Sequence, residues 1–548
     1  MEGPDVGAWD HIGLYWRIDT NVVAAFAGGR VERDEWSRMF GHYINLSLVS
    51  QLLDFLSWAR SQDSIDYSGS EIELSGTALA LQLKDTPGDL EDFRRKLKEN
   101  LVAFEADVNN IDDGKVPRLS IQGRPIVELV RSITTIAPFK GKTVYFLLDE
   151  FENLSDYQQR CFNTLIKHSG DAPYTFKVGV KETGHREVGV AHSSETLIEP
   201  SDFVTIDISD RLKKHDFAAF ADSVCTQRLS RIAEFQGSMQ DALPKVTAED
   251  EARILGAQQR RQQVRAQIGN AERRRQFDQW TDLQAVFVGY WSGAMRVTVD
   301  DAIDEFVLEP SLWRKRLNNH QNAMLFTLRR GMVGQRKLYA GWETFVALAE
   351  GNIRYLLQLV GEALSRHIAD GKQLTAPVSP EIQTAAAQQI GLRILKQLPG
   401  MAAQGAQLAK LVLGLGRVFQ VMASQPEGHT PEISQFRTEG SPSQEAQELL
   451  DAAVMHLALV RFPGDKRAAN SGETSDWNYM LHPIFAPYFV YSHRRKRRMT
   501  VSSRDLIALT KNPSPTIGKI LQKHSRNDRA EPLPEQLDLF EGFYGAAY

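Results

Sequence analysis

The segment Val144–Leu154 reads VYFLLDEFENL, and its pattern decides the fold of the N-terminal part of the chain. A continuous apolar run is typical of a strand that is buried on both faces of a mainly parallel sheet. The run ends in Asp149 and Glu150, and the carboxyl ends of such strands are where open α/β sheets bind ligands. There an aspartate can hold Mg²⁺ and a glutamate can act as a general base. The alternative is structural, with Glu150 capping a helix or forming a salt bridge.

Similar apolar runs occur on both sides of this segment. We expect further strands at Ile12–Asp19, Thr175–Val180 and Phe203–Ile208. Residues with helical spacing of apolar side chains lie between the runs, and Ser155 is placed to cap one of these helices. Strands that alternate with helices predict a mainly parallel sheet covered by helices on both faces. We assign residues 1–210 to this α/β domain.

The rest of the chain is predicted to be largely helical. Residues 211–371 contain no strand pattern, and residues 228–280 form a charged stretch inside them that we interpret as a helical insert. Lys372–Glu381, with its Pro and Ser, is typical of a linker. Residues 382–499 combine helices with a pair of short strands, which suggests a winged-helix-like domain. Residues 511–548 contain NPSPT and EPLPEQ, and we expect a weakly ordered tail there.

Composition narrows the class of protein. The chain has 548 residues, a formal net charge of -5 and two cysteines. Two cysteines exclude a disulfide scaffold and a multi-cysteine zinc site, and they suit a reducing cytosol. We see no signal peptide and no apolar run near the roughly 20 residues of a membrane span, so we expect a cytoplasmic protein without membrane contact. The net charge argues against an extensive DNA interface and allows a local one.

Five segments, in this order, resemble the AAA+ ATPases related to the origin recognition complex, in particular a bacterial branch outside replication initiation. The resemblance covers the chain from about Ile12 to Arg498. The five segments are LLDEFENLSDYQQRCFNTLIK from Leu147, FKVGVKETG from Phe176, EPSDFVTIDI from Glu199, GNIRYLLQLV from Gly351 and YMLHPIFAPYFVYSHRRKRR from Tyr479.

The resemblance implies a site for ATP and Mg²⁺. In it, Asp149 would bind the metal and Glu150 would activate the attacking water. Lys181 would be the sensor residue after the neighbouring strand. The tetrapeptide GNIR would begin a helix of an all-helical lid, where Gly351, Asn352 and Arg354 would contact the nucleotide and Arg354 would be the second sensor. Alternatively, Asn352 or Gly351 only caps that helix.

An arginine finger acting on a neighbouring subunit is also implied. Arg160 and Arg186 are both candidates, and the sequence does not choose between them.

A phosphate-binding loop of the type G-x-x-x-x-G-K-[ST] is required for such a site, and the sequence contains none. The fragment FKGKT at Phe139–Thr143 has Ile136 where the first glycine belongs, and it leads into a strand instead of a helix. In the family that the chain resembles, this loop and its βα unit precede a strand of the Ile12–Asp19 type. The resemblance therefore implies an α/β, parallel-sheet P-loop NTPase core without its first βα unit, followed by a helical lid with an insert and the winged-helix-like domain. Either the reading frame is shortened or the protein dispenses with ATP.

The basic run Arg494, Arg495, Lys496, Arg497 and Arg498 is the candidate DNA contact. Five adjacent cations beside a winged helix suit DNA phosphates, whereas a solvated or ion-paired run is the alternative.

The resemblance implies a homo-oligomer or a partner protein, for which residues 228–280 are a candidate docking arm. Two functions stay open. One is an ATP-dependent switch associated with DNA or a partner effector, in a mobile-element or phage-defence setting, but inactive toward ATP as this chain. The other is a non-enzymatic scaffold.

Overall fold

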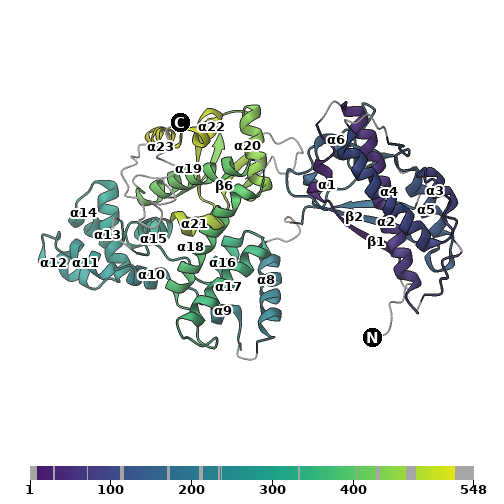
Figure 1. The fold of residues 1–548 in the computed structure, drawn as a ribbon. Helices are drawn as coiled ribbons and strands as arrows, with labels where there is room; N and C mark the ends of the chain where they lie inside the picture. Colours follow the sequence, from purple (N-terminus) through teal and green to yellow (C-terminus); the bar gives the residue numbers. More distant parts are fainter. Residues whose placement is uncertain are drawn as a thin grey trace. The chain divides into compact units, whose positions relative to one another are not determined.

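The computed structural model describes residues 9–524, except for residues 29–30, 64, 71, 112–116, 169–172, 209–213, 233–234, 236, 331, 333, 403, 427–431 and 465–476. The chain divides into two compact units, Met1–Ile206 and Asp207–Tyr548. Figure 1 shows both units.

Unit 1 is built on a parallel sheet of three strands. They are β1 (His11–Arg17), β2 (Thr143–Asp149) and β3 (Tyr174–Val178), in the order β1-β2-β3. The central position of β2 follows from its apolar run, and the register sets Arg17 opposite Asp149. The strands predicted near Ile12, Val144 and Thr175 are therefore confirmed, and the chain has a mixed α/β fold with a parallel N-terminal sheet.

Helices of unit 1 cover one face of this sheet. Ile12, Leu14 and Trp16 are buried on that face, where the Trp16 ring lies near Tyr43 and Phe162. The helices are α1 (Thr20–Ala24), α2 (Arg33–Arg60), α3 (Ser75–Ala80), α4 (Leu90–Asn109), α5 (Arg124–Thr134) and α6 (Asp156–Lys167), with short 3₁₀ turns at η3 (Ala137–Phe139) and η4 (Phe151–Asn153).

Two expectations for unit 1 are wrong. The second face of the sheet is not covered by the described part of unit 1, and Tyr15 on that face is 57% exposed. The segment Phe203–Ile208 is not a strand, and Val204 and Ile206 are 67% and 58% exposed. Its alternating β-branched residues favour a strand, but a strand also needs a partner for its backbone groups, and the segment pairs with no described strand.

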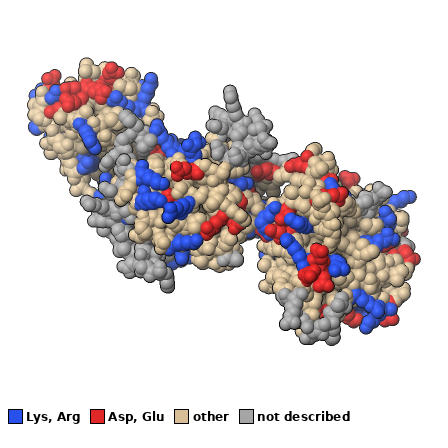
Figure 2. Space-filling model, turned by 90° about the horizontal axis from the view of Figure 1, so that it is seen from above, with Lys and Arg blue, Asp and Glu red and all other residues tan. Residues whose placement is uncertain are grey.

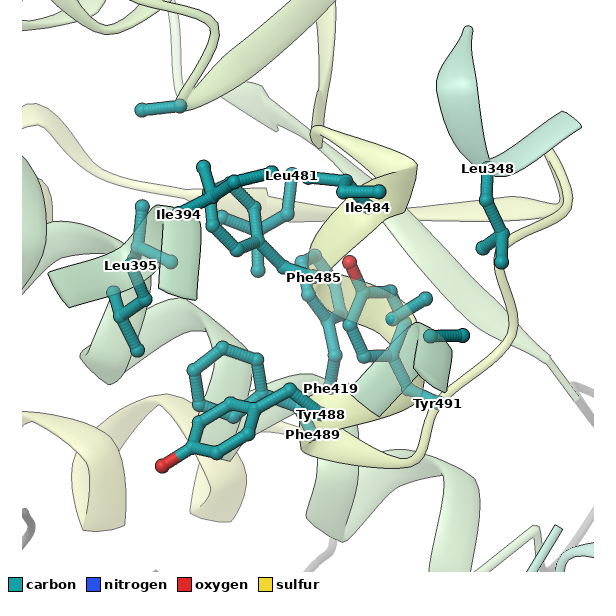
Figure 3. Close-up of a cluster of buried hydrophobic side chains, with 14 of the residues drawn as sticks. Leu348, Ile394, Leu395, Phe419, Leu481, Ile484, Phe485, Tyr488, Phe489 and Tyr491 are labelled. Atoms are coloured by element: carbon teal, nitrogen blue, oxygen red, sulfur yellow. The ribbon is translucent and has the colours of Figure 1, made fainter. Parts of the chain in front are cut away.

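Unit 2 is mostly helical around one large core. Figure 3 shows part of this core, where Leu348, Ile394, Phe419 and Phe489 come from four different helices. The helices are α8 (Lys214–Leu229), α9 (Met239–Ala242), α10 (Ala248–Ile254), α11 (Ala257–Arg265), α12 (Ala271–Asp278), α13 (Asp282–Met295), α14 (Val299–Leu308), α15 (Pro310–Leu325), α16 (Trp342–Ala349), α17 (Ile353–Ala369), α18 (Pro380–Gln397), α19 (Gly405–Ser424), α20 (Gln444–Met455), α21 (Ala486–Phe489), α22 (Ser503–Lys511) and α23 (Pro513–Lys523), with short 3₁₀ turns at η5 (Leu398–Gly400) and η7 (Pro483–Phe485).

The predicted boundary at Lys372–Glu381 does not separate two cores. The loop there buries Leu374 and Val378 in the same cluster that holds Leu359 of α17 and Ile390 of α18. The helices before and after the loop therefore fold as one body.

The charged insert is longer than expected. A second hydrophobic cluster extends from Ala252 to Leu325 and includes Phe287 and Trp313, so α10–α15 form a helical subdomain with its own core. The arginines that suggested a solvated stretch form ion pairs across this subdomain. Arg273, for example, binds Asp304 at 2.6 Å. The charged residues correctly indicated the surface of the insert. The apolar residues after residue 280, which complete its core, were not assigned to it.

A four-stranded sheet completes unit 2, in the order β5-β6-β4-β7. The predicted strand pair is present as β5 (Leu459–Pro463) antiparallel to β6 (Trp477–Leu481). The strands β4 (Ile433–Thr438) and β7 (Arg497–Val501), parallel to each other, were not predicted.

The predicted tail differs as well, because Pro513–Lys523 forms a helix that buries Ile517 and Leu521. Residues 525–548 lie outside the described part.

One helix contradicts the expectation about membrane spans. By length and composition α19, Gly405–Ser424, is apolar enough to cross a membrane. Of its most apolar window, 83% is buried inside the protein, as in the core helix of a folded domain.

Candidate functional site

Asp149 is held at the carboxyl end of the central strand by two hydrogen bonds. The Tyr15 hydroxyl donates to its Oδ2 at 2.7 Å, and the Glu150 N–H donates to its Oδ1 at 2.9 Å. The first bond raises the pKa of Tyr15. A carboxylate has about four acceptor positions, so two of them stay open. Gly179, directly after β3, leaves room here, because an added Cβ would lie 3.3 Å from Asp149 Oδ1.

Glu150 has an unusual backbone and a cationic partner. Its φ is 60°, in the left-handed region that side chains other than glycine rarely adopt. The Arg17 guanidinium donates to its Oε1 at 2.8 Å and the Asn153 amide donates to its Oε2 at 3.1 Å. The bond to Glu150 raises the pKa of Arg17. The structural alternative of a salt bridge is therefore present. Glu150 also stands at the N-cap position of η4, but its side chain makes no capping hydrogen bond there.

Tyr15 and Arg17 were missed in the sequence. They face the uncovered side of β1, where every second residue is exposed. The alternation of side chains in Ile12–Asp19 could have indicated that Tyr15 and Arg17 face outward. Nothing in the sequence indicated the strand pairing that sets Arg17 beside Glu150.

Lys181 lies beyond the end of β3 and is paired with a residue that the sequence did not single out. Its Nζ is 3.0 Å from Oε1 of Glu152, whose side chain is 5% exposed. The backbone N–H of Lys181 also points to Glu152, at 3.4 Å. The role of Lys181 as a sensor stays a prediction, and the pair supports its alternative, a surface lysine at a strand end.

Both arginine-finger candidates have partners within unit 1. Arg160 binds Glu187 at 2.9 Å. Arg186 binds Asp156 at 3.0 Å and donates to the backbone carbonyl of Glu152 at 3.1 Å. Arg186 therefore ties the loop after β2 to the loop after β3, and its guanidinium is already occupied. Neither arginine is favoured for a contact with another subunit.

The GNIR tetrapeptide forms the turn between α16 and α17 in unit 2. Asn352 Oδ1 accepts from the backbone N–H groups of Arg354 and Tyr355, at 3.0 and 3.2 Å. Asn352 is thus the N-cap of α17, as one alternative stated. Gly351 has φ 81° and supplies the left-handed turn. The Arg354 side chain is exposed. Its nucleotide contact stays a prediction.

The basic run leads into strand β7, and its members differ in their partners. Arg494 Nη2 is 3.9 Å from Oε1 of the buried Glu432. Arg495 binds Glu350, and its guanidinium carbon lies 3.5 Å from the Phe462 ring centre.

The other three cations have no acidic partner in the described ranges. Arg498 donates to the neutral oxygens of Gly464 and Asn478, both at 3.3 Å. Lys496 and Arg497 are exposed. Figure 2 shows both basic and acidic side chains on the face of the molecule that it draws. Three cations are thus available to a phosphate chain.

A shallow pocket of about 330 Å³ lies on the uncovered face of the sheet. It is lined by Tyr15, Leu147, Leu148, Asp149, Lys177, Val178 and Gly179. Within the described residues, no group of three or more His, Cys, Asp or Glu is placed to hold a metal ion. Mg²⁺ in phosphate-transfer sites needs only one or two carboxylates, because phosphates and water supply the other ligands. Asp149 therefore fits the metal side of such a site.

The parallel α/β sheet, with an acidic pair at the carboxyl edge of its central strand, is consistent with a P-loop-like core. A comparison with family models gives the family. The chain belongs to the ORC-CDC6-like family, whose model matches residues 2–501, and it is accordingly related to the ORC-type AAA+ ATPases. Neither the curated proteins nor the solved structures contain a match.

Proposed function

We propose that this protein is an ORC-type AAA+ switch subunit that associates with DNA through its C-terminal basic run. In the proposal, Asp149 and Glu150 are the metal and base side of an ATP site. The supporting observation is the position of these two carboxylates at the carboxyl end of β2, in a chain whose family match covers residues 2–501. A winged-helix role for the C-terminal part, a bacterial origin and a cytoplasmic location remain part of the proposal.

The residues present fit the metal side of the proposed ATP site better than its phosphate side. Asp149 has open acceptor positions and would hold Mg²⁺, which neutralises charge on the phosphates when it is bound. Glu150 is within the same turn, but both of its carboxylate oxygens already accept hydrogen bonds, from Arg17 and Asn153. The phosphate side does not fit, because the 548 residues contain no G-x-x-x-x-G-K-[ST] loop. We infer that this chain by itself does not turn over ATP.

ATP turnover tests the first half of the proposal. The chain is assayed alone and after fusion, in frame before Met1, to a strand–G-x-x-x-x-G-K-[ST]–helix unit. We expect hydrolysis only from the fusion, and its loss in Glu150→Gln with nucleotide binding retained. The matched control is Glu182→Gln, which removes an acidic group from the next loop. Equal turnover by Glu150→Gln and Glu182→Gln would reject Glu150 as the base.

A scaffold without enzyme activity is the second candidate. Two observations favour it: the missing phosphate loop and the Arg17–Glu150 pair, which engages the candidate base. It predicts that the fused chain still fails to hydrolyse ATP, while the unmodified chain binds DNA or a partner protein. Hydrolysis by the fusion that depends on Glu150 would exclude it.

We also propose that the protein associates with partner chains. Association with itself or with another protein is expected of the family, and α10–α15 are the candidate docking arm because they have a core of their own. Deleting Ala257–Leu325 keeps Glu251, which binds the buried Lys337 at 2.5 Å, and should leave the main core of unit 2 folded and remove the partner. If the deletion leaves the assembly size unchanged in light scattering, the arm is not the docking element.

A further inference from the structure

One cation of the basic run is bound to the turn that begins α17. Arg495 forms an ion pair with Glu350, and its guanidinium carbon lies 3.5 Å from the centre of the Phe462 ring. The Glu350 side chain is 25% exposed and that of Arg495 is 51% exposed. The pair is thus accessible from solvent on the side of Arg495.

The turn that Glu350 belongs to is conformationally demanding. Glu350 has φ 43° and Gly351 has φ 81°, two consecutive left-handed residues. The turn is closed by the Asn352 N–H, which donates to the Ala349 carbonyl at 2.9 Å. A left-handed residue other than glycine persists only where its surroundings hold it. The ion pair with Arg495 is one of the contacts that hold Glu350 in place.

The same turn carries the residues expected at a nucleotide. Asn352 caps α17 and thereby fixes the first turn of the helix, in which Arg354 is exposed. Only three residues lie between Glu350 and Arg354. A change in the position of Glu350 therefore acts directly on the backbone that presents Arg354.

We propose that the Arg495–Glu350 pair is a latch that couples DNA binding to the α16–α17 turn. A DNA phosphate and the Glu350 carboxylate compete for one guanidinium, because two anions close to each other repel. DNA that takes Arg495 releases Glu350 and loosens the turn. Phe462 keeps the released guanidinium in place by a cation–π contact. By linkage, whatever holds the turn closed weakens the DNA contact by the same factor. The inference rests on the proposed DNA binding.

The test combines DNA affinity with hydrogen exchange. Wild type, Glu350→Gln and the control Glu343→Gln are titrated with a short duplex at several salt concentrations. Glu343 lies on α16 and pairs with Lys245 at 2.9 Å, so the control removes the same charge, and one ion pair, from the helix that ends directly before Glu350. Each released cation steepens the salt dependence by about 0.9, so between about 50 and 200 mM salt Glu350→Gln should lose about 3-fold more affinity than the control. Exchange of the amides at residues 350–355 should rise when DNA binds wild type.

The outcomes separate the latch from the proposed function. Wild type that binds DNA, with equal slopes for Glu350→Gln and Glu343→Gln or with unchanged exchange at residues 350–355, overturns the latch and leaves DNA binding intact. DNA binding that appears only in Glu350→Gln supports the latch. If neither protein binds DNA, the DNA part of the proposed function fails and the latch fails with it. A rise in exchange at residues 350–355 in Arg495→Ala without DNA supports the contact itself.

Discussion

The salt dependence of DNA binding gives the sharpest prediction for the basic run, and the perturbation is the double variant Lys496→Ala/Arg497→Ala. Ion pairing divides the five cations: Arg494 and Arg495 face Glu432 and Glu350, whereas the other three have no acidic partner in the part of the chain that the structure describes. If only unpaired cations release counterions, the slope of log K against log[salt] is about -2.7 for three cations, compared with about -4.5 for five.

These slopes translate into measurable losses of affinity. Between about 50 and 200 mM salt, three cations predict about a 40-fold loss and five predict about a 500-fold loss. In Lys496→Ala/Arg497→Ala only Arg498 remains unpaired, and the loss falls to about 3- to 4-fold. The measurement is fluorescence anisotropy of a labelled duplex at several salt concentrations.

The control for this experiment removes the same charge elsewhere. Arg131→Ala/Lys140→Ala takes two exposed cations from unit 1 and should leave the slope unchanged. A slope near -4.5 in wild type would show that all five cations contribute to DNA binding, including the two that form ion pairs. An identical slope in the double variant and the control would refute the assignment of the run as the DNA contact.

Three predictions concern stability. Asn352→Ala should lower the free energy of unfolding of unit 2 by about 1 kcal/mol, because α17 loses its cap; Asn352→Asp keeps the cap, and equal urea midpoints for the two variants would contradict it. Gly184→Ala should destabilise unit 1 by about 1–3 kcal/mol, because the added Cβ would lie 2.7 Å from Glu152 Cβ; an unchanged melting temperature would contradict it. Burial lowers the pKa of His42 to about 4 and of His482 to about 3. Both are neutral when folded, so stability is complete above the unfolded value of about 6.5 and falls with pH below it, by about 2 kcal/mol per histidine at about pH 5. In urea unfolding, His482→Gln should lose less than wild type over this range, and equal losses would contradict the assignment.

The strands could be predicted where an apolar run was long enough to require burial. Thr143–Asp149 is the clearest case, because its continuous apolar run is typical of a strand in a parallel sheet. Phe203–Ile208 has similar residues and is not a strand, since propensity does not supply a pairing partner. The α10–α15 core was missed in part because the charged surface of its first helices concealed the periodicity of the apolar side.

The site was predictable in its residues and not in its partners. Asp149 and Glu150 follow from their place after a buried strand. Their contacts with Tyr15 and Arg17 depend on the register of two strands that lie more than a hundred residues apart in sequence, and a single sequence contains no signal for that register. The Arg495–Glu350 pair depends in the same way on the tertiary fold of unit 2.

Binding of Mg-ATP to the unmodified chain tests the central claim most directly. The claim is that Asp149 and Glu150 mark the metal side of an ATP site whose phosphate side is missing from these 548 residues. A ligand that binds the folded state at about 100 times its Kd stabilises it by about 2.7 kcal/mol, which thermal unfolding detects easily. We predict no change in melting temperature with millimolar Mg-ATP for wild type or for Asp149→Asn. A rise of several degrees in wild type that is absent in Asp149→Asn would contradict the account, because it would require a complete site within this chain.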